Sequence, residues 1–416
     1  MTAGGARGHG HVGVIGAGIQ GICAALALAD RGARVTLIER TDRAMMGASL
    51  WNEGKLHLGL VYGKDASQRT IVAMARAALA FMPFLTRYID QARFDAMLSG
   101  PLFYGVHRDS MVDADAVIAH FQACRRIFAE QRAATGGRYP LLGDELAIER
   151  LSAAEAGSIF DPGHIRAAFR TGERSINPHR LAAALVDVAT RHPRIVFRLG
   201  ERVDSVSNDK TGRPGVRLAG GEVETFDQLV NASWEDRLRL DATIGISPPR
   251  PWIHRYKVGI RGRWRHADNL PSLTMVLGSF GDVVNYGNGD VYLSWYPTCM
   301  LARSDAVSPG WQDAPPLPAD RRTIASTTRE ALAAIVPGLR DMTPDGDLVV
   351  GGGSIFAWGA TDIDDPDSRL HVRHDTGVES HGRYHTVNTG KYTAAPLNAL
   401  DLVDRICGPQ RLAAIG

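Results

Sequence analysis

Three glycines near the start of the chain, Gly16, Gly18 and Gly21, have the spacing G-x-G-x-x-G. A short apolar run, residues 11–15, precedes them, and an Ala/Leu-rich stretch, residues 19–32, follows. A strand, a tight glycine turn and a helix in this order can hold a pyrophosphate, because the helix N-terminus carries N–H groups and partial positive charge. The spacing therefore predicts a dinucleotide-binding unit.

A second apolar run, residues 33–39, ends in Glu39, which stands 21 residues after Gly18. A carboxylate at this distance accepts hydrogen bonds from an adenosine ribose that carries no phosphate, so FAD or NAD is favoured over NADP. The first candidate contacts to the dinucleotide are Gly16, Ala17, Gly18, Ile19, Gln20, Gly21, Glu39 and Arg40.

The segment that follows, residues 47–63, reads GASLWNEGKLHLGLVYG. It is too polar for a buried strand and too rich in glycine for a helix, whereas an NAD-binding domain normally continues with another strand and helix. Glycines let a backbone lie against a flat ring system, and Ser49 and Asn52 can donate hydrogen bonds to phosphate or ribityl oxygens. The segment therefore favours FAD.

This segment resembles the flavin-binding part of the D-amino-acid oxidase and glycine oxidase superfamily of FAD-dependent oxidoreductases. The residues that match the pattern are Gly47, Ala48, Ser49, Asn52 and Gly54. Within the superfamily, the next residues are nearest to flavin-dependent L-2-hydroxyglutarate dehydrogenases and, more loosely, to glycerol-3-phosphate dehydrogenases. The residues that carry this nearer likeness are His57, Gly59 and Tyr62. Because Trp51, Glu53 and Leu58 depart from the hydroxyglutarate enzymes, their substrate is not implied.

The resemblance recurs along the chain. Residues 172–192 resemble a family segment in which a loop ends at a helix start, with Asn177 as the N-cap and Pro178 as the first helical residue. Residues 194–206 are typical of two short strands, and Val203 stands where family members contact the adenine through main-chain atoms.

Two later segments complete the match. Residues 226–237 resemble the strand that usually ends in Asn-Ala-Ala-Gly, with Ser233 in place of the glycine, and residues 382–406 resemble the element in which a turn meets the flavin and opens the last helix. The further FAD contacts that the resemblance implies are Ser49, Asn52, Gly54, Lys55, Leu56, Val203, Ala232, Gly390, Lys391 and Tyr392.

The motif and the resemblance imply an α/β fold, in which a Rossmann-like FAD-binding domain of the glutathione-reductase type is interleaved with a mixed-sheet α+β substrate domain. A length of 416 residues suggests two units. We expect the FAD-binding domain to comprise residues 11–65, 165–235 and 345–410, and the substrate domain to comprise residues 66–164 and 236–344.

The two insertions that form the substrate domain differ in character. The first is expected to be helical, with residues 65–82 cut by Pro83 and residues 113–133 ended by two glycines. The second is expected to be mostly strands, with a hairpin at residues 282–297, followed by a helix at residues 321–335.

Basic residues alternate along the strand expected at residues 255–265. The residues that share the basic face are Arg255, Lys257, Arg261, Arg263 and Arg265. A solvated basic face is the more ordinary interpretation, because strand faces turned to water are usually charged. The alternative is a clamp in which Arg255 or a neighbour binds the carboxylate of a substrate.

Candidate catalytic residues stand near the flavin segments. His57 is the candidate general base or hydrogen-bond partner, since histidines titrate near neutrality, and structural packing beside the flavin is the alternative. Tyr286 and Tyr296 could wall a substrate pocket or belong to the core. Lys55 and Lys391 could stabilise negative charge on the reduced ring or bind phosphate.

The expected function is that of an FAD-dependent oxidoreductase. It would move a hydride from a C–N or C–O carbon of a small, carboxylate-bearing substrate to flavin N5 and pass the electrons to oxygen or another acceptor. The alternatives are a non-catalytic or sensing FAD-binding protein and a flavin monooxygenase.

Composition limits the other partners. A formal net charge of +2 gives no bulk attraction to nucleic acid or to an anionic membrane. Four cysteines lie far apart, no metal site is expected, and residues 362–367 lack the glycine and Glu of an EF-hand and are expected to form a solvated loop. With no apolar run long enough to span a bilayer, we expect a cytoplasmic protein with a short disordered lead, and the oligomeric state is left open.

Overall fold

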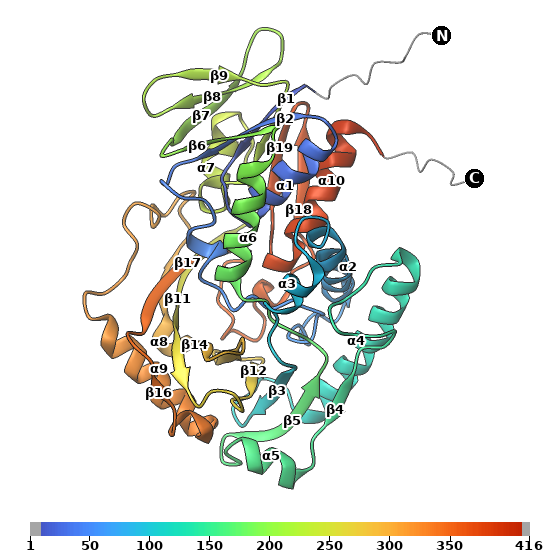
Figure 1. Cartoon of the computed structure of the whole chain (residues 1–416), viewed down its shortest axis with the longest axis vertical. Coiled ribbons are helices and arrows are strands. Elements are labelled where there is room, and N and C mark those ends of the chain that lie inside the picture. Colours follow the sequence, from blue (N-terminus) through green and yellow to red (C-terminus); the bar gives the residue numbers. More distant parts are fainter. Residues whose placement is uncertain (1–9, 410–416) are drawn as a thin grey trace. The chain divides into compact units, whose positions relative to one another are not determined.

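The structure is a computed structural model that describes residues 10–409 (Figure 1). The expected disordered lead falls within residues 1–9, outside the described range. Contacts divide the chain into two compact units. The first comprises Met1–Met46, Ala182–Pro249 and Thr376–Gly416, and the second comprises Gly47–Leu181 and Arg250–Asp375.

The expected domain bounds and these units do not coincide. Residues 47–65, 165–181 and 345–375 are expected in the FAD-binding domain, whereas their contacts place them in the second unit. The expected domains are defined by the ligand that they bind, whereas the two units are defined by the contacts within them. The units therefore do not test the expected bounds. The expected domain bounds therefore stay a prediction.

A six-stranded sheet forms the centre of the first unit, in the order β18-β19-β10-β1-β2-β6. β1 (His11–Ile15) is central and pairs in parallel with β2 (Arg34–Glu39) and β10 (Gln228–Asn231). The outer strands are β6 (Ile195–Leu199), β19 (Tyr384–Asn388) and the antiparallel β18 (Gly377–His381). Because β1, β2 and β10 run in parallel, their carboxyl ends meet at one edge of the sheet, where α/β folds bind nucleotides.

Helices and a small antiparallel sheet complete the first unit. α1 (Ile19–Asp30) packs against β2 and against α10 (Ala395–Cys407), which lies beside it in Figure 1. The remaining elements are α6 (Pro178–Arg191), which begins in the second unit, α7 (Arg237–Thr243), the 3-10 turns η2 (Trp234–Asp236) and η5 (Tyr392–Ala394), and the strands β7 (Val203–Asn208), β8 (Pro214–Leu218) and β9 (Val223–Thr225). The expected α/β fold class is confirmed.

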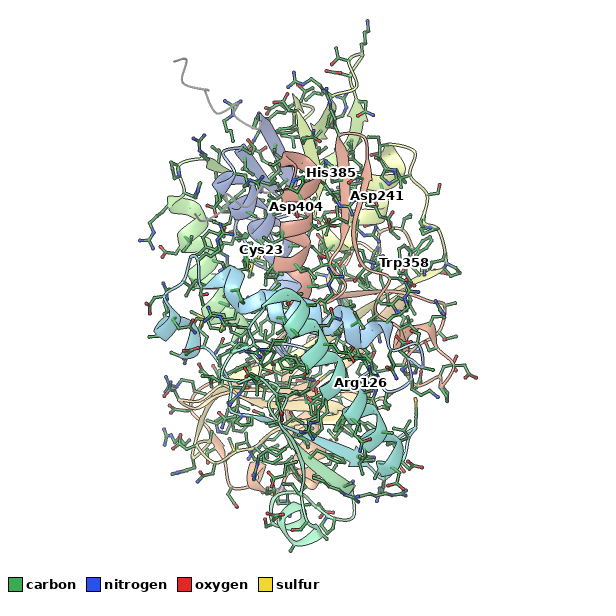
Figure 2. All side chains as sticks on the ribbon, turned by 90° about the vertical axis from the view of Figure 1, so that its right-hand side faces the viewer. Cys23, Arg126, Asp241, Trp358, His385 and Asp404 are labelled. Atoms are coloured by element: carbon green, nitrogen blue, oxygen red, sulfur yellow. The ribbon has the colours of Figure 1, made fainter. Side chains whose placement is uncertain are left out.

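Close contact between a helix and a turn explains the third glycine of the motif. Residues 19–29 of α1 are all buried, and among them is Cys23, which is labelled in Figure 2. A Cβ atom on Gly21 would lie 1.8 Å from the carbonyl oxygen of Gly16. Only glycine therefore lets the first turn of α1 lie against the end of β1.

A ten-stranded mixed sheet forms the second unit, in the order β15-β11-β14-β13-β12-β3-β5-β4, with β16 and β17 also paired to β11. Its centre is β11 (Trp252–Arg265), and the antiparallel partners of β11 are β14 (Asp290–Trp295), β15 (Met300–Ser304), β16 (Thr343–Pro344) and β17 (Val349–Trp358). The other strands are β3 (Leu102–His107), β4 (Ile148–Arg150), β5 (Ile165–Thr171), β12 (Ser272–Val276) and β13 (Gly281–Asn285). The parallel pair β3–β12 makes the sheet mixed, as expected.

Helices and short turns surround this sheet. They are α2 (Arg69–Leu85), α3 (Gln91–Asp95), α4 (Ala114–Thr135), α5 (Ala153–Ile159), α8 (Tyr296–Cys299), α9 (Arg321–Ile335), η1 (Gly47–Ser49), η3 (Pro337–Leu339) and η4 (Arg369–His371). The expected end of α4 at Gly136, the hairpin of β13 and β14 and the helix α9 are all confirmed. Within residues 10–409, no helix has both the length and the apolar character needed to cross a membrane.

The expected break at Pro83 is wrong, because α2 continues through it to Leu85. A proline inside a helix leaves the carbonyl oxygen four residues earlier without its helical donor. Here that oxygen belongs to Leu79, and it accepts a hydrogen bond from the main-chain N–H of Arg138 at 3.1 Å. A donor from the segment after α4 thus replaces the missing one, and the helix keeps its last turn.

Replacing Gly21 with alanine should disrupt the first unit. The added Cβ meets a main-chain oxygen that cannot move aside without shifting β1, so we expect the Gly21→Ala variant to lose about 3 kcal/mol or more of unfolding free energy. Denaturant unfolding measures this loss. The matched control is Gly220→Ala, since no atom lies within 4 Å of a Cβ at that position. Equal stability of the two variants would contradict the proposed close contact.

Candidate active site

The N-terminus of α1 is suited to a pyrophosphate. Gly18 is the N-cap of the helix, and no acidic residue occupies the first turn. The partial positive charge of the helix N-terminus is therefore not offset by a carboxylate on the helix itself.

Glu39 lies at the glycine turn. Its Oε2 accepts a hydrogen bond from the main-chain N–H of Ala17 at 2.8 Å, and its Oε1 accepts hydrogen bonds from the N–H and the hydroxyl of Thr41, both at 3.0 Å. These contacts hold the carboxylate beside the turn and leave it further lone pairs for ribose hydroxyls. Arg40, which follows β2, is half-buried.

Ala232 lies against the same turn. Its N–H donates to the carbonyl oxygen of Ile15 at 2.9 Å. Its own carbonyl oxygen would lie 2.7 Å from a Cβ on Gly16, whose φ is +95°. The structure thus brings together the ends of β1 and β10, and the contact of Ala232 with FAD stays a prediction.

A buried carboxylate joins the end of β10 to β19. Asp241 on α7, labelled in Figure 2, accepts hydrogen bonds from Asn231 Nδ2 at 2.9 Å and from the Tyr384 hydroxyl at 2.7 Å. Thr386 on β19 donates to its other oxygen at 2.9 Å. The strand then leads into Gly390, whose φ of +67° makes the turn before α10.

Gln20 links the two ends of the first unit. Its Nε2 donates to the carbonyl oxygen of Ala395 at 3.4 Å, and its Oε1 accepts from Asn398 Nδ2 at 3.1 Å. Both partners lie in the first turn of α10, directly after the candidate residues Lys391 and Tyr392. Candidate contacts from the start and the end of the chain therefore lie close together within this unit.

Val203 stands at the start of β7. Its side chain is buried among the apolar residues that surround Ile38, and its carbonyl oxygen accepts a hydrogen bond from Arg239 Nη2 at 2.8 Å. The expected main-chain contact to adenine stays a prediction.

In the second unit, the segment of residues 47–63 has a fixed conformation. Asn52 Nδ2 donates to the carbonyl oxygen of Ala48 at 2.9 Å, while its Oδ1 accepts from the N–H of Gly54 at 2.7 Å. The Asn52 side chain thus holds its own turn, and Ser49 lies in the short turn η1. Hydrogen bonds from these two side chains to a phosphate or ribityl oxygen stay a prediction.

Gly54 and Trp51 of this segment make close contacts with neighbouring backbone. Gly54 has a φ of +61°, and a Cβ there would lie 1.8 Å from the carbonyl oxygen of Ile176. The Trp51 ring lies directly over β17, 2.1 Å from where a Cβ of Gly351 would be. Glycine is therefore required at position 54 of the segment and at position 351, opposite Trp51.

Lys55 ends in a buried ion pair. Its Nζ is 2.8 Å from Asp282 Oδ1, and both side chains are buried. Lys257 Nζ is 3.8 Å from the other oxygen of Asp282, and Thr274 donates its hydroxyl to Oδ1 at 2.9 Å. Burial opposes the charge of Lys55, but the carboxylates of Asp282, Glu53 and Glu173 together outweigh it and raise the pKa of this lysine. A contact of Lys55 with the cofactor stays a prediction.

His57 and Tyr286 both lie beside Glu53. His57 is buried, its Nε2 is 4.0 Å from Glu53 Oε1, and its ring centroid is 5.9 Å from that of Tyr62. The Tyr286 hydroxyl donates to the carbonyl oxygen of Glu53 at 3.0 Å, and burial raises the pKa of this tyrosine well above its usual value. The neighbouring candidate Leu56 is buried, and its carbonyl oxygen accepts from the Tyr139 hydroxyl at 2.9 Å.

Arg255 and Tyr296 are in direct contact. Arg255 Nη1 donates to the Tyr296 hydroxyl and, at 2.8 Å, to Asp362 Oδ1. The other oxygen of Asp362 lies 2.7 Å from Arg303 Nη2. Asp362 is buried, so the expected solvated loop at residues 362–367 is wrong at its first residue, because this carboxylate neutralises two arginines.

The expected solvated basic face of β11 is also wrong over half its length. Arg255 is 3% exposed, and Lys257 and Arg261 are largely covered, whereas Arg263 and Arg265 are exposed as expected. β11 has partner strands on both edges, and carboxylates from other elements neutralise the buried cations. Both faces of the strand are covered there, so alternation does not mark a surface exposed to water.

Arg373 is a buried cation that sequence reasoning missed. It is 8% exposed, and its Nη1 donates only to the carbonyl oxygen of Phe356, at 3.3 Å. Within residues 10–409, its guanidinium makes no ion pair with a carboxylate. Burial and the nearby charge of Arg255 lower the pKa of Arg373 to about 10, so it stays charged at neutral pH. No periodicity or motif marks this residue in the sequence.

Glu173 is a second residue that sequence reasoning missed. It is fully buried, and it accepts hydrogen bonds from the Tyr104 hydroxyl and from the N–H of Leu58, the latter at 2.6 Å. Burial raises the pKa of Glu173 to about 7, although Lys55 and these hydrogen bonds act in the opposite direction.

A family model described as FAD dependent oxidoreductase, DAO, matches residues 11–395. The chain belongs to this family. Its cofactor is therefore FAD, and it is an FAD-dependent oxidoreductase. The expected family, cofactor and class of enzyme are confirmed, whereas the nearer likeness to L-2-hydroxyglutarate dehydrogenases stays a prediction.

Solved structures show how far the DAO-family fold extends. Glycine oxidase from Geobacillus kaustophilus aligns with a TM-score of 0.67 at 15% identity, over 97% of this chain and 96% of that chain. Iminodiacetate oxidase from a Chelativorans species gives 0.65 at 16% identity, over 97% of both chains. L-alpha-glycerophosphate oxidase from Mycoplasma pneumoniae gives 0.64 at 14% identity, over 96% and 94%. At these identities the likeness shows the fold, and a comparison with curated proteins finds no match.

The residues of the first unit fit the cofactor of this family. Gly21 and Gly16 allow a contact that a Cβ would block, the start of α1 has no acidic residue in its first turn, and Glu39 is held at the turn. Such a cradle suits a pyrophosphate and an unphosphorylated ribose. The individual contacts to FAD stay predictions.

Glu173 should make stability depend on pH. Its usual pKa is 4.5 and its pKa in the folded chain is about 7, so the folded state holds the proton more tightly than the unfolded state. Unfolding free energy should therefore fall as pH rises between these values, by on the order of 3 kcal/mol. The Glu173→Gln variant should lack this fall.

Thermal unfolding at a series of pH values checks this expectation. The control is Glu149→Gln, which changes a carboxylate that is 62% exposed and should leave the pH dependence of the wild type intact. A Glu173→Gln curve parallel to that of the wild type would contradict the neutral, buried state of this carboxyl group.

Proposed function

We propose that this DAO-family enzyme oxidises a small amine or hydroxy acid that carries a carboxylate, and passes the electrons to oxygen or another acceptor. The observation that carries the proposal is Arg373, a buried guanidinium with no carboxylate partner among the described residues.

Arg373 differs from the other buried cations of the second unit in having no carboxylate partner among the described residues. Lys55, Lys257 and Arg255 each have a carboxylate within 4 Å, from Asp282 or Asp362. Arg373 adds one more buried positive charge. An isolated buried charge costs several kcal/mol, and a carboxylate on the substrate would neutralise it through charge-assisted hydrogen bonds.

The two arginines differ in how they are held. Arg255 is held by hydrogen bonds to Tyr296 and Asp362, and its positive charge would add to the charge around the ligand. Arg373 has a main-chain carbonyl as its only acceptor within the described chain, so its remaining donors can turn to a ligand. We therefore assign carboxylate binding to Arg373 and a supporting role to Arg255.

Proton transfer is assigned to His57. FAD, when bound, accepts the hydride from the carbon that bears the amine or hydroxyl. A ring nitrogen of His57 would take the proton from that amine or hydroxyl. Glu53, 4.0 Å from Nε2, would stabilise the imidazolium that forms. Burial of both His57 and Arg373 keeps water away from the proposed proton transfer.

The names of the structural relatives agree with this substrate class. Glycine oxidase and iminodiacetate oxidase are named for amines that carry carboxylates. Glycerophosphate oxidase is named for an anionic alcohol, so experiment must decide whether the substrate is oxidised at an amine or at a hydroxyl.

We also propose the reduced cytoplasmic setting expected from four dispersed cysteines.

Anaerobic bleaching of the flavin tests the proposed function. The purified holoenzyme is mixed with amino acids, N-methyl amino acids and hydroxy acids, and the visible flavin bands are followed. Each acid is paired with the amine or alcohol that lacks its carboxylate. We expect bleaching by at least one acid and not by its decarboxylated partner. No bleaching by any compound would favour a sensing or monooxygenase role, and equal bleaching by both partners would exclude the carboxylate requirement.

Removing the charge of Arg373 should weaken substrate binding. We expect the Arg373→Met variant to raise KM about 10- to 100-fold, because it loses a buried charge-assisted contact. Steady-state kinetics with the acid found in the screen measure this. The control is Arg263→Met, which removes an exposed arginine of β11 and should leave KM unchanged. Unchanged kinetics in Arg373→Met would remove this residue from the site.

A further inference from the structure

Glu173 fastens the segment that carries Lys55 and His57. The Glu173 carboxylate follows β5, and its Oε2 accepts a hydrogen bond from the main-chain N–H of Leu58 at 2.6 Å. Its Oε1 accepts from the hydroxyl of Tyr104 on β3. Because Leu58 directly follows His57, one buried carboxylate connects the sheet to the backbone beside the candidate base.

Main-chain pairing brings this carboxylate to its place. The N–H of Leu56 donates to the carbonyl oxygen of Arg174 at 2.9 Å, and the N–H of Ile176 donates to that of Gly54 at 2.8 Å. Residues 54–56 thus run antiparallel to residues 174–176. The hydrogen bond from Leu58 to the Glu173 side chain extends the pairing by two residues, as far as the position next to His57.

The charge state of Glu173 alters this anchor. The titratable groups that face Glu173 come from residues 53–62, from β3 and from the region of α4. They are Glu53, Lys55 and Tyr62, then Tyr104 on β3, and finally Cys124 on α4 and Tyr139 after it. Lys55 is the cation of this set, and its own closest partner is Asp282. An ionised carboxylate accepts a hydrogen bond from an N–H more strongly than a neutral carboxyl does. Ionisation would therefore tighten the bond to Leu58 and add a negative charge near Lys55.

We propose that Glu173 is a positioning residue, whose ionisation fastens residues 54–58 and so sets the position of His57 and the charge balance at Lys55 during turnover. The effect on turnover rests on the proposed function, whereas the effect on the segment does not. The burial that raises the pKa of Glu173 to about 7 places the change within the range in which the enzyme can be assayed.

Hydrogen–deuterium exchange tests the anchor directly. The holoenzyme and its Glu173→Gln variant are compared below and above the pKa of about 7, in the peptide that contains Leu58. Glutamine keeps the size of the side chain and does not titrate; its amide oxygen can accept from the N–H of Leu58, while its amide nitrogen donates to the Tyr104 hydroxyl. The ratio of the two exchange rates at each pH cancels the intrinsic pH dependence of exchange.

The expected result is a change in this ratio with pH. For local openings that break the bond to Leu58 and leave Glu173 buried, wild type should protect Leu58 roughly fivefold more above the pKa, relative to the variant, than below it. The control variant Glu149→Gln should follow the wild type. A ratio that is the same at every pH would overturn the proposal.

A second variant distinguishes an effect of Glu173 ionisation from structural damage in Glu173→Gln. Tyr104→Phe removes a hydrogen bond that lowers the pKa of Glu173, so the pH at which the protection of Leu58 changes should move upward. Merely structural damage would lower protection at every pH without moving this transition. A transition that stays in place would argue against control by Glu173.

The pH profile of kcat/KM provides the test on turnover. With the acid found in the flavin screen, an inflection caused by Glu173 should move upward in Tyr104→Phe, together with the transition in the protection of Leu58, whereas an inflection caused by the proposed base His57 should stay in place. A Tyr104→Phe profile identical to that of the wild type would overturn the link to turnover. If no acid bleaches the flavin, the proposed function fails, and the exchange ratio still decides whether Glu173 anchors the segment.

Discussion

Pairing of buried charge is the constraint on which the second unit depends. Asp282 and Asp362 come from β13 and from the loop after β17, and they neutralise cations that β11 and the glycine-rich segment bring inside. A buried charge without a partner is strongly unfavourable, so these contacts fix which elements lie together. Arg373 has no carboxylate partner within residues 10–409, and this unpaired buried charge is what favours an anionic ligand.

Local rules explain how much of the fold could be predicted. The first strand, the glycine turn and α1 were predictable because the contact between Gly21 and Gly16 depends on residues five apart. The same locality holds for the end of α4 at Gly136 and for the hairpin turn before Asp290. In each case the decisive interaction lies within the predicted element or at its boundary.

The substrate-side residues could not be predicted in this way. Whether the basic face of β11 is buried depends on Asp362, which stands 107 residues beyond Arg255. The alternation of charged and apolar residues is the same for a face covered by other parts of the chain as for one in water. The helix around Pro83 could not be predicted for the same reason. The N–H donor that preserves α2 comes from Arg138, which lies beyond the next long helix in the sequence. Glu173 and Arg373 have no local signature, since their roles follow only from what surrounds them.

The hydrogen bonds of Gln20 have a consequence for how the chain folds during its synthesis. Gln20 and its partner Asn398 are 378 residues apart, and the six strands of the sheet that contains β1 come from three separate stretches of the chain. A ribosome releases β1, α1 and β2 long before β10 and α10 exist, so one edge of β1 and part of the apolar surface of α1 stay without partners until those elements have been synthesised. Parallel strands of such high contact order form slowly and are prone to aggregate while unpaired. The first unit can therefore be completed only after β19 and α10 have been synthesised.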